Sequence, residues 1–196
     1  MLFSGSFSFL PFPVLETSRL LLRRTTLQDA SDIFEMRSDP EVMKYIPRPI
    51  AKSEEDVFAL IHLIDGFIET GERINWAIEL KENGKVLGLI GYVNISVEHQ
   101  RAEVGYSLNR SWHRKGIVKE ALKAVLDFGF ANMKLHTVNA IVDAENTPSA
   151  SLLENVGFRK EAHFLEDFLW NGNFRNSIHY GILNREWENN EFEFNS

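Results

Sequence analysis

Two short segments of this 196-residue chain combine residue types that bind anions and move protons. The first segment, residues 112–118, reads WHRKGIV and places His113, Arg114 and Lys115 directly before Gly116. A strand leads into this turn and a helix is expected to begin at Gly116. The free N–H groups and the positive dipole end of that helix would form an anion site. A solvated basic turn has the same sequence features, so these residues alone leave both interpretations open.

The second segment, residues 143–158, follows the next predicted strand and opens the next predicted helix. Thr147 is expected to cap the N-terminus of this helix, Pro148 suits its first position, and Gly157 is expected to end it. If the strands that precede the two segments separate, an elongated ligand could lie between them. Its phosphates would contact the first helix, and its other end would lie near the second.

The elements that must position these segments follow from hydrophobic periodicity. Strand and helix patterns alternate from Leu15 onward, and Asn83-Gly84 predicts a hairpin turn between two of the strands. The predicted strands are residues 19–24, 75–80, 86–97, 101–108, 137–142, a strand from 158 and one near 177–183, and predicted helices begin near 26, 53, 116 and 147. A run of antiparallel strands before a β-α-β crossover predicts an α/β (α+β) protein, with a mixed sheet between helices.

The composition restricts the class of protein. The 21 Lys and Arg residues against 28 Asp and Glu residues give a formal net charge of −7, which argues against direct binding to nucleic acid. The chain has no cysteine, which excludes disulfides and cysteine nucleophiles and suits a reducing cytoplasm. The six histidines show no HxxxH or HExxH spacing, so no metal site is predicted. No window approaches the ~18 uncharged residues of a membrane helix, so no membrane association is expected.

The two segments together resemble the GCN5-related N-acetyltransferases (GNAT), and within them the RimJ/RimL-like branch that acetylates protein N-terminal amines. The motifs that carry the resemblance are LETSRLLLR (residues 15–23), AEVGY (102–106), the turn from Trp112 to Gly116, EAL (120–122), and ENTPS (145–149) followed by Gly157-Phe158. Each motif is weak alone, but their order over residues 15–186 fits the predicted elements.

The resemblance implies a GNAT fold, in which a mostly antiparallel central sheet of about seven strands holds acetyl-CoA where its fourth and fifth strands splay apart. It implies one catalytic domain over residues 15–187, with residues 1–14 as an apolar arm and residues 188–196 as an acidic tail. It also implies transfer of an acetyl group from acetyl-CoA to a primary amine within a ternary complex. The acceptor would be a protein N-terminal α-amine of the ribosomal-protein Ala/Ser type, and no metal or acyl-enzyme is expected.

The resemblance assigns roles to individual residues. Glu103 is the candidate general base, which accepts the amine proton directly or through a water, and an ordinary cross-strand charge is the alternative. Ser149 is the candidate proton donor to the CoA thiolate, and Asn146 is the candidate ligand of the pantetheine arm. Their alternatives are a first-turn serine and a plain turn residue. Leu108 or a neighbour is expected to supply the backbone amide that binds the acetyl oxygen.

Further residues are assigned to the two substrates. The predicted pyrophosphate site consists of His113, Arg114, Lys115, Gly116, Ile117 and Val118. Tyr106 and Trp112 are candidates for lining the acceptor cleft, although aromatic residues beside a sheet are more often core. Glu166 and Asp167 are alternative bases, although exposed carboxylates are the norm on a strand end.

Two positions depart from the family pattern. Val118 stands where glycine or alanine is usual, so its side chain must point away from the ligand. Leu153 stands where many members place a tyrosine proton donor, which leaves Ser149 as the hydroxyl candidate. A small-molecule amine acceptor (an antibiotic, polyamine or amino acid) and a non-catalytic CoA-binding or interaction module are the alternative functions. We expect a cytoplasmic protein, and the apolar arm and edge strands are compatible with a homodimer.

Overall fold

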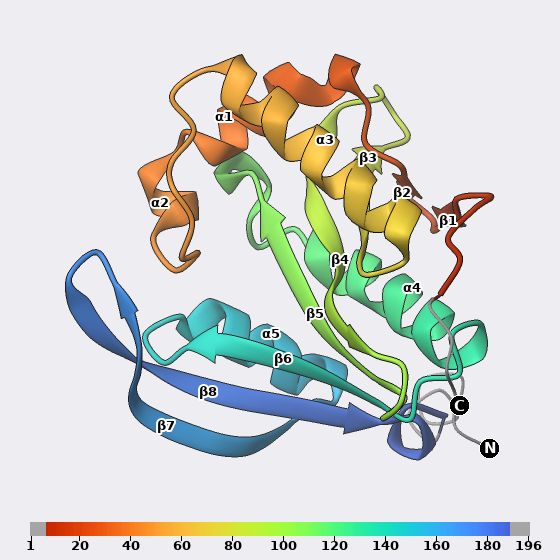
Figure 1. Cartoon of the computed structure of the whole chain (residues 1–196), viewed down its shortest axis with the longest axis vertical. Coiled ribbons are helices and arrows are strands. Elements are labelled where there is room, and N and C mark those ends of the chain that lie inside the picture. The colour runs from red at the N-terminus through yellow and green to blue at the C-terminus, as the bar shows by residue number, and fades with distance from the viewer. Residues whose placement is uncertain (1–6, 189–196) are drawn as a thin grey trace.

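The computed structural model describes residues 7–188, which form an eight-stranded mixed sheet with helices on both faces (Figure 1). The strands are β1 (Leu15–Glu16), β2 (Leu20–Arg23), β3 (Ile74–Leu80), β4 (Val86–Ser96), β5 (Arg101–Leu108), β6 (Thr137–Asp143), β7 (Arg159–Trp170) and β8 (Asn173–Leu183). The helices are η1 (Leu27–Asp29), α1 (Ala30–Arg37), α2 (Pro40–Met43), α3 (Glu54–Thr70), η2 (Arg110–Trp112), α4 (Ile117–Ala131) and α5 (Thr147–Val156). The strand order is β1-β2-β3-β4-β5-β6-β8-β7.

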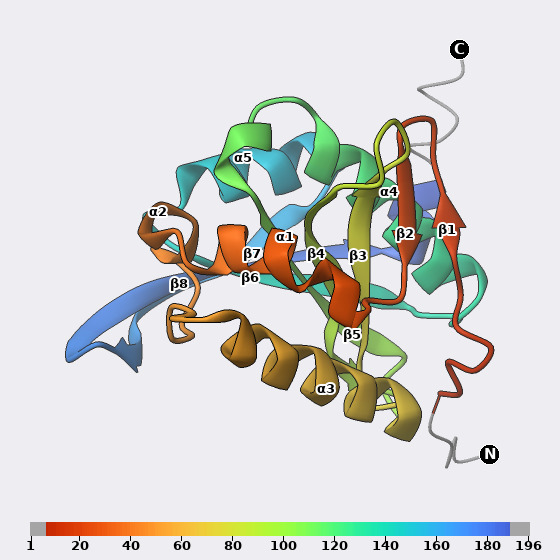
Figure 2. The same ribbon diagram turned by 90° about the horizontal axis from the view of Figure 1, so that it is seen from above.

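Helices α1 and α3 cover one face of the sheet, and α4 and α5 cover the other (Figure 2). Each long helix buries one apolar stripe, because residues three or four positions apart lie on the same side. In α3 this stripe comprises Val57, Ile61, Ile64 and Ile68, and Gly71 ends the helix in the left-handed conformation at a φ of 72°. The helices cover the middle of the sheet, whereas most side chains of β7 are exposed.

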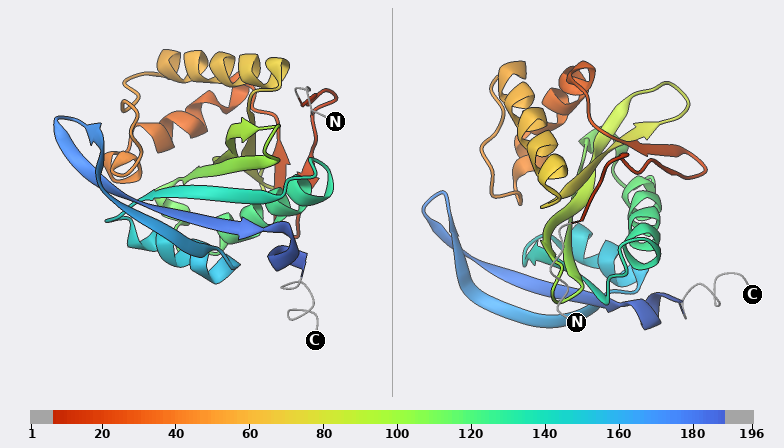
Figure 3. Two further views of the ribbon diagram at one scale, coloured as in Figure 1. Left: turned by 60° about the horizontal axis from the view of Figure 1, so that its bottom comes forward. Right: turned by 45° about the vertical axis from the view of Figure 1, so that its right-hand side comes forward.

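The sheet opens between its two parallel strands. β5 and β6 are paired from Arg101 with Thr137 to Glu103 with Asn139, and the pairing ends there. β6 stays paired with β8 along its whole length, so β5 and β6 diverge toward their C-terminal ends (Figures 1 and 3). Helices α4 and α5 follow these two strands and therefore begin at the wide end of the gap. The predicted fold, including the separation of these strands, is confirmed.

Two local predictions differ from the structure. The N-cap of α5 is Asn146 and not Thr147, and the Asn146 Oδ1 accepts a hydrogen bond from the Ser149 N–H at 3.3 Å. Asparagine is at least as good an N-cap as threonine, and with Asn146 as the cap the helix begins one residue earlier, at Thr147. The two-residue strand β1 pairs with β2 and brings the sheet to eight strands instead of about seven.

Residues 7–14, the described part of the predicted N-terminal arm, pack against the sheet. Phe9 is buried in the core, and Trp76 Nε1 donates a hydrogen bond to the Pro13 carbonyl at 2.7 Å. The rings of Phe12 and Trp76 meet edge to face. Residues 1–6 of the arm and 189–196 of the predicted tail lie outside the described residues. Between residues 7 and 188, no helix is long and apolar enough to cross a membrane.

Candidate active site

The turn before α4 has the backbone conformation of an anion-binding site. Arg114 and Gly116 adopt left-handed conformations, with φ angles of 59° and 73°, and Gly116 is the N-cap of α4. The first N–H groups of a helix have no acceptor inside the helix, and alternating backbone conformations of this kind direct successive N–H groups into a concavity. The side chains of His113, Arg114 and Lys115 are exposed around it. The structure therefore brings the predicted pyrophosphate residues together at one helix end.

Glu120, in the first turn of α4, ties this turn to the β1–β2 hairpin. Its carboxylate accepts hydrogen bonds from Thr17 Oγ1 at 2.6 Å, Ser18 Oγ at 3.0 Å, and the backbone N and Nε of Arg19 at 2.9 and 2.7 Å. Arg19 Nη1 also donates to the Lys115 carbonyl at 3.0 Å. Burial alone would raise the pKa of Glu120, but the hydrogen bonds from Thr17, Arg19 and Ser18 outweigh it and lower the pKa to about 2.

The end of β5 presents backbone groups to the gap. The Asn109 N–H donates to the Leu87 carbonyl on β4 at 2.8 Å. Hydrogen-bonded and non-hydrogen-bonded pairs alternate along an antiparallel ladder, so Leu108, opposite Gly88, directs its N–H and C=O away from β4. The Leu108 carbonyl lies 3.0 Å from His113 Nε2, and the Leu108 N–H faces the gap. This placement is compatible with the predicted amide for the acetyl oxygen.

Ser149 and Tyr106 form a hydroxyl pair that joins α5 to β5. Their oxygens lie 2.7 Å apart, with Ser149 in the first turn of α5 and Tyr106 near the end of β5. Burial raises the pKa of Tyr106 to about 12 against the opposing effect of the Ser149 hydrogen bond, so the phenol is protonated at neutral pH. Leu153, at the position of the missing family tyrosine, is fully buried in the core. Ser149 and Tyr106 are therefore two hydroxyl groups placed at the wide end of the gap.

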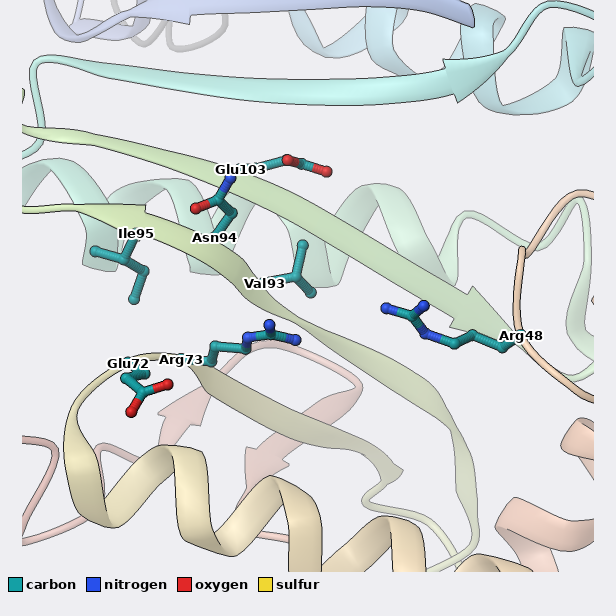
Figure 4. A pocket seen from close by; sticks show the side chains of 7 residues that line it. All are labelled: Arg48, Glu72, Arg73, Val93, Asn94, Ile95 and Glu103. Carbon is teal, nitrogen blue, oxygen red and sulfur yellow. The ribbon is translucent and has the colours of Figure 1, made fainter. Parts of the chain in front are cut away.

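Glu103 faces a cavity of about 530 Å³ beside the C-terminal end of α3 (Figure 4). The cavity is lined by Arg48, Glu72, Arg73, Val93, Asn94, Ile95 and Glu103. Burial raises the pKa of the Glu103 carboxyl, while a hydrogen bond with Asn94 and the charges of His179, Arg73 and Arg101 oppose the rise. A carboxyl with a raised pKa binds a proton more readily than an exposed glutamate, which suits a general base.

The Glu103 and Tyr106 side chains lie on opposite faces of the sheet. They are three positions apart on the continuous strand β5, and successive side chains of a strand alternate between faces. The irregularity in the β4–β5 ladder, between Tyr92 and Asn94, belongs to β4 and leaves the alternation of β5 intact. A proton acceptor and a proton donor therefore approach the gap from its two sides.

Three other predicted residues lie outside the cavity lining. The Trp112 ring lies beneath Lys115 Nζ, 4.5 Å from it, in the turn before α4. Tyr106 contacts Ser149 instead, so the role of both aromatic residues in the acceptor cleft stays a prediction. Val118 packs against the hydrophobic core, as a valine at this position must if the backbone site is to stay open.

The alternative bases Glu166 and Asp167 lie on β7, where the ladder with β8 is irregular. Asp167 Oδ2 accepts a hydrogen bond from Ser177 Oγ at 2.6 Å, and Glu166 is exposed at a φ of 51°. Neither residue lines the cavity that contains Glu103. The geometry therefore favours Glu103 among the three candidate bases.

Sequence reasoning missed Arg48, Arg73 and Asn139. Arg48 lies between two prolines, and Arg73 lies between α3 and β3, so neither belongs to a periodic pattern that would mark it. Asn139 is opposite Glu103 in the β5–β6 register, which places both side chains on one face. The buried Asn139 Oδ1 has no hydrogen-bond partner within residues 7–188.

A family model for the acetyltransferase (GNAT) domain matches residues 19–159. The chain belongs to the GNAT acetyltransferase family. "Uncharacterized N-acetyltransferase YoaA" of Bacillus subtilis (strain 168) is 33% identical over 172 residues, which cover 88% of this chain and 97% of that protein. "Spermidine N(1)-acetyltransferase" of Escherichia coli (strain K12) is 26% identical over 85% of this chain and 87% of its own length. The structure of Mycobacterium smegmatis RimJ in complex with CoA-disulfide has the same fold, with a TM-score of 0.81, 24% identity and coverage of 89% and 88%.

The residues of this GNAT domain fit acetyl-CoA as the acetyl donor. The exposed left-handed turn and the start of α4 suit a pyrophosphate, since both offer N–H groups and positive charge. The β5–β6 gap is open from Glu103 onward and suits an extended arm. The chain is therefore an acetyl-CoA-dependent N-acetyltransferase, and the specific contacts of Asn146, Leu108 and residues 113–118 with acetyl-CoA stay predictions.

Proposed function

We propose that this enzyme acetylates the α-amine of a protein N-terminus, of the ribosomal-protein Ala/Ser type, by direct attack on acetyl-CoA in a ternary complex. One observation supports direct transfer: the candidate base Glu103 and the Ser149–Tyr106 pair reach the same gap from opposite faces of the sheet. An acceptor can enter beside Glu103 while acetyl-CoA lies along the starts of α4 and α5. Both substrates can then be bound at once.

The proton path follows from this arrangement. Glu103 accepts a proton from the acceptor amine, directly or through a water, and the neutral amine attacks the thioester carbonyl. The new N–C bond forms, the attacking nitrogen loses its second proton to solvent, and the C–S bond breaks, with the electron pair of that bond leaving on the sulfur. Ser149, oriented by its hydrogen bond with Tyr106, donates a proton to the thiolate, and solvent returns one to Ser149. Holding the two substrates together supplies a large part of the rate enhancement.

An α-amine suits a carboxylate base better than a side-chain amine does. The pKa of an α-amine is about 7.7–8.0 and that of lysine is about 10.4, so roughly a tenth of an α-amine is already neutral at pH 7. At neutral pH a smaller fraction of an N-terminal amine than of a lysine or an alkylamine must therefore be deprotonated by the base. A small-molecule amine is the second candidate, because the E. coli relative is named for spermidine.

An acceptor screen tests the proposal. CoA release is measured with peptides that begin with Ala or Ser, the same peptides with a blocked N-terminus and a free lysine, free amino acids, and spermidine. We expect unblocked peptides to give the highest kcat/KM, with the acetyl group on the α-amine by mass spectrometry. Ser149→Ala should lower kcat and leave the Kd of CoA unchanged. Turnover of blocked peptides or spermidine alone would contradict the proposed acceptor, and an acetylated enzyme on the reaction path would contradict direct transfer.

A further inference from the structure

Two arginine side chains reach the acceptor cavity from opposite ends (Figure 4). Arg48 comes from the segment between α2 and α3, and Arg73 comes from the segment between α3 and β3. Neither guanidinium forms an ion pair with a carboxylate of residues 7–188. The Arg48 Nη1 donates only weakly, to the Pro47 carbonyl at 3.4 Å. The cavity therefore offers two guanidinium groups that are available to an anion.

Arg73 is held in place without using its hydrogen-bonding edge. Its guanidinium carbon lies 4.2 Å from the centroid of the Phe67 ring, and its side chain is half-buried. Stacking occupies one face of the planar guanidinium, while the N–H donors at its edge stay free. A guanidinium edge matches a carboxylate, which accepts two parallel hydrogen bonds. Arg73 is therefore preorganised for an acidic group.

The opposite side of the site suits an amine. Glu103 supplies a carboxylate to the cavity, and behind the lining, opposite Glu103 in the β5–β6 register, Asn139 has a buried side-chain oxygen with no partner among residues 7–188. A buried acceptor without a donor is unusual in a folded protein. An ammonium group has three N–H donors, which can bind both oxygens and still direct one N–H bond toward the gap.

We infer that the acceptor carries a carboxylate close to its reactive amine, with the amine held by Glu103 and Asn139 and the carboxylate held by Arg48 and Arg73. The inference rests on the proposed acetyl transfer and narrows its acceptor to an anionic amine. The carboxylate can belong to an acidic residue near a peptide N-terminus, which keeps the proposed protein acceptor, or to a free amino acid, which would replace it. Glu72, the remaining charged residue of the cavity, is exposed at its edge. A polyamine would place its second cation toward the guanidinium groups, where like charges repel.

Matched acceptor pairs test the inference directly. Peptides that begin Ala-Glu and Ala-Gln differ in one charge at nearly equal size, and free alanine and alaninamide differ in the same way. Spermidine serves as the cationic comparison. We expect kcat/KM to be about 10-fold or more higher for the carboxylate member of at least one pair, because charge-assisted hydrogen bonds are among the stronger ones. The pair that shows the preference identifies the source of the carboxylate.

Variants of Arg48 and Arg73 test whether the two arginines bind the acceptor or only stabilise the fold. Arg48→Ala and Arg73→Ala should raise KM for the anionic acceptor about 10- to 100-fold, with little change in KM for its neutral partner or in the Kd of CoA. Arg48 is exposed, so its removal should leave folding intact. Arg73→Lys keeps the charge but loses the planar fork and should recover only part of the affinity. Lys160→Ala, which removes an exposed cation from β7, is the matched control. It should change neither the KM for the anionic acceptor nor the KM for the neutral one.

Calorimetric titration of each acceptor pair into the enzyme with CoA measures the same preference without turnover. Tighter binding of the anionic member, lost in the arginine variants, would support the inference. Equal binding and equal kcat/KM for anionic and neutral members would overturn it, while acetylation of both would leave the proposed function intact. If no amine were acetylated, the proposed function would fail and the binding preference would still decide the inference.

Discussion

The two sides of the β5–β6 gap are built in different ways. On the side where we predict acetyl-CoA to bind, backbone groups and a helix start are the candidate ligands, and four hydrogen bonds to Glu120 join α4 to the β1–β2 hairpin. On the acceptor side, side chains from distant segments converge on a cavity, and Arg48 and Arg73 have no carboxylate partner in residues 7–188. The predicted acetyl-CoA side is thus fixed by hydrogen bonds between neighbouring segments, which suits a donor substrate that does not vary. The other can change its ligand through single substitutions that leave the fold intact.

The largest expected effect comes from the base, which should affect turnover and not acetyl-CoA binding. Glu103→Gln removes the proton acceptor and should lower kcat by about 10²- to 10⁴-fold. The Kd of CoA, measured by calorimetry, should stay within about twofold, because Glu103 lies on the opposite face from Tyr106 and Ser149. Glu98→Gln, an exposed carboxylate in the β4–β5 turn, is the control and should behave like the wild type. Full activity of Glu103→Gln would remove Glu103 from the mechanism.

The pH dependence of kcat should report the ionisation of Glu103. Burial raises the pKa of Glu103 above its usual value of 4.5, and only the ionised carboxylate can accept a proton. Activity should therefore be present above the raised pKa and fall about tenfold per pH unit below it. Steady-state kinetics with saturating substrates measure this acidic limb of the kcat–pH profile. The limb should be absent from the residual activity of Glu103→Gln, and an identical limb in that variant would assign it to another group.

A smaller effect is expected from the backbone of the turn before α4. Gly116→Ala introduces a side chain at a φ of 73°, and Gly84→Ala does so at 74° in the β3–β4 turn. Both variants should lose about 1–2 kcal/mol of unfolding free energy, because L-residues avoid this conformation. Only Gly116→Ala should also raise the Kd of CoA, by about 10-fold, through displaced N–H groups. Equal CoA affinities in the two variants would show that the turn is not part of the acetyl-CoA site.

The smallest effect on catalysis is expected from the link between Glu120 and the β1–β2 hairpin. Glu120→Gln should lower the unfolding free energy at pH 7 by about 1–3 kcal/mol, because charged hydrogen bonds are lost. The pKa of Glu120 is lowered from 4.5 to about 2 in the folded state, so its contribution is complete above pH 4.5 and disappears as the pH falls toward 2. Urea unfolding at pH 7 and pH 3 should show a larger difference between wild type and variant at pH 7. An equal difference at both pH values would contradict this role.

Much of the acetyl-CoA side could be predicted from the sequence, because its determinants are local. β5 has the predicted bounds, Arg101–Leu108, and α4 begins directly after Gly116. The basic residues and the glycine are consecutive, so one turn brings them together without help from distant segments. The N-cap of α5 was assigned to the wrong residue because Asn146 and Thr147 are both good caps, and only the backbone path distinguishes them.

The acceptor side could not be predicted in the same way. Arg48 and Arg73 line one cavity with Glu103 only through the packing of α3 on the sheet, and Asn139 lies opposite Glu103 only through the register of β5 with β6. Two of them lie outside regular elements, where no periodicity indicates a direction for the side chain. The Ser149–Tyr106 contact was missed for a related reason, since it depends on how α5 lies against β5.

The separation of β5 and β6 also has a consequence for the protein without its substrates. Backbone groups such as the Leu108 N–H face the gap instead of a neighbouring strand, so the sheet contains an inner strand edge as well as its two outer ones. Unpaired strand edges are sites where other extended chains can add. We therefore expect the edge of β5 to exchange its amide hydrogens quickly in the free enzyme and slowly when CoA occupies the gap. The donor substrate would then act as a missing strand that seals the middle of the sheet.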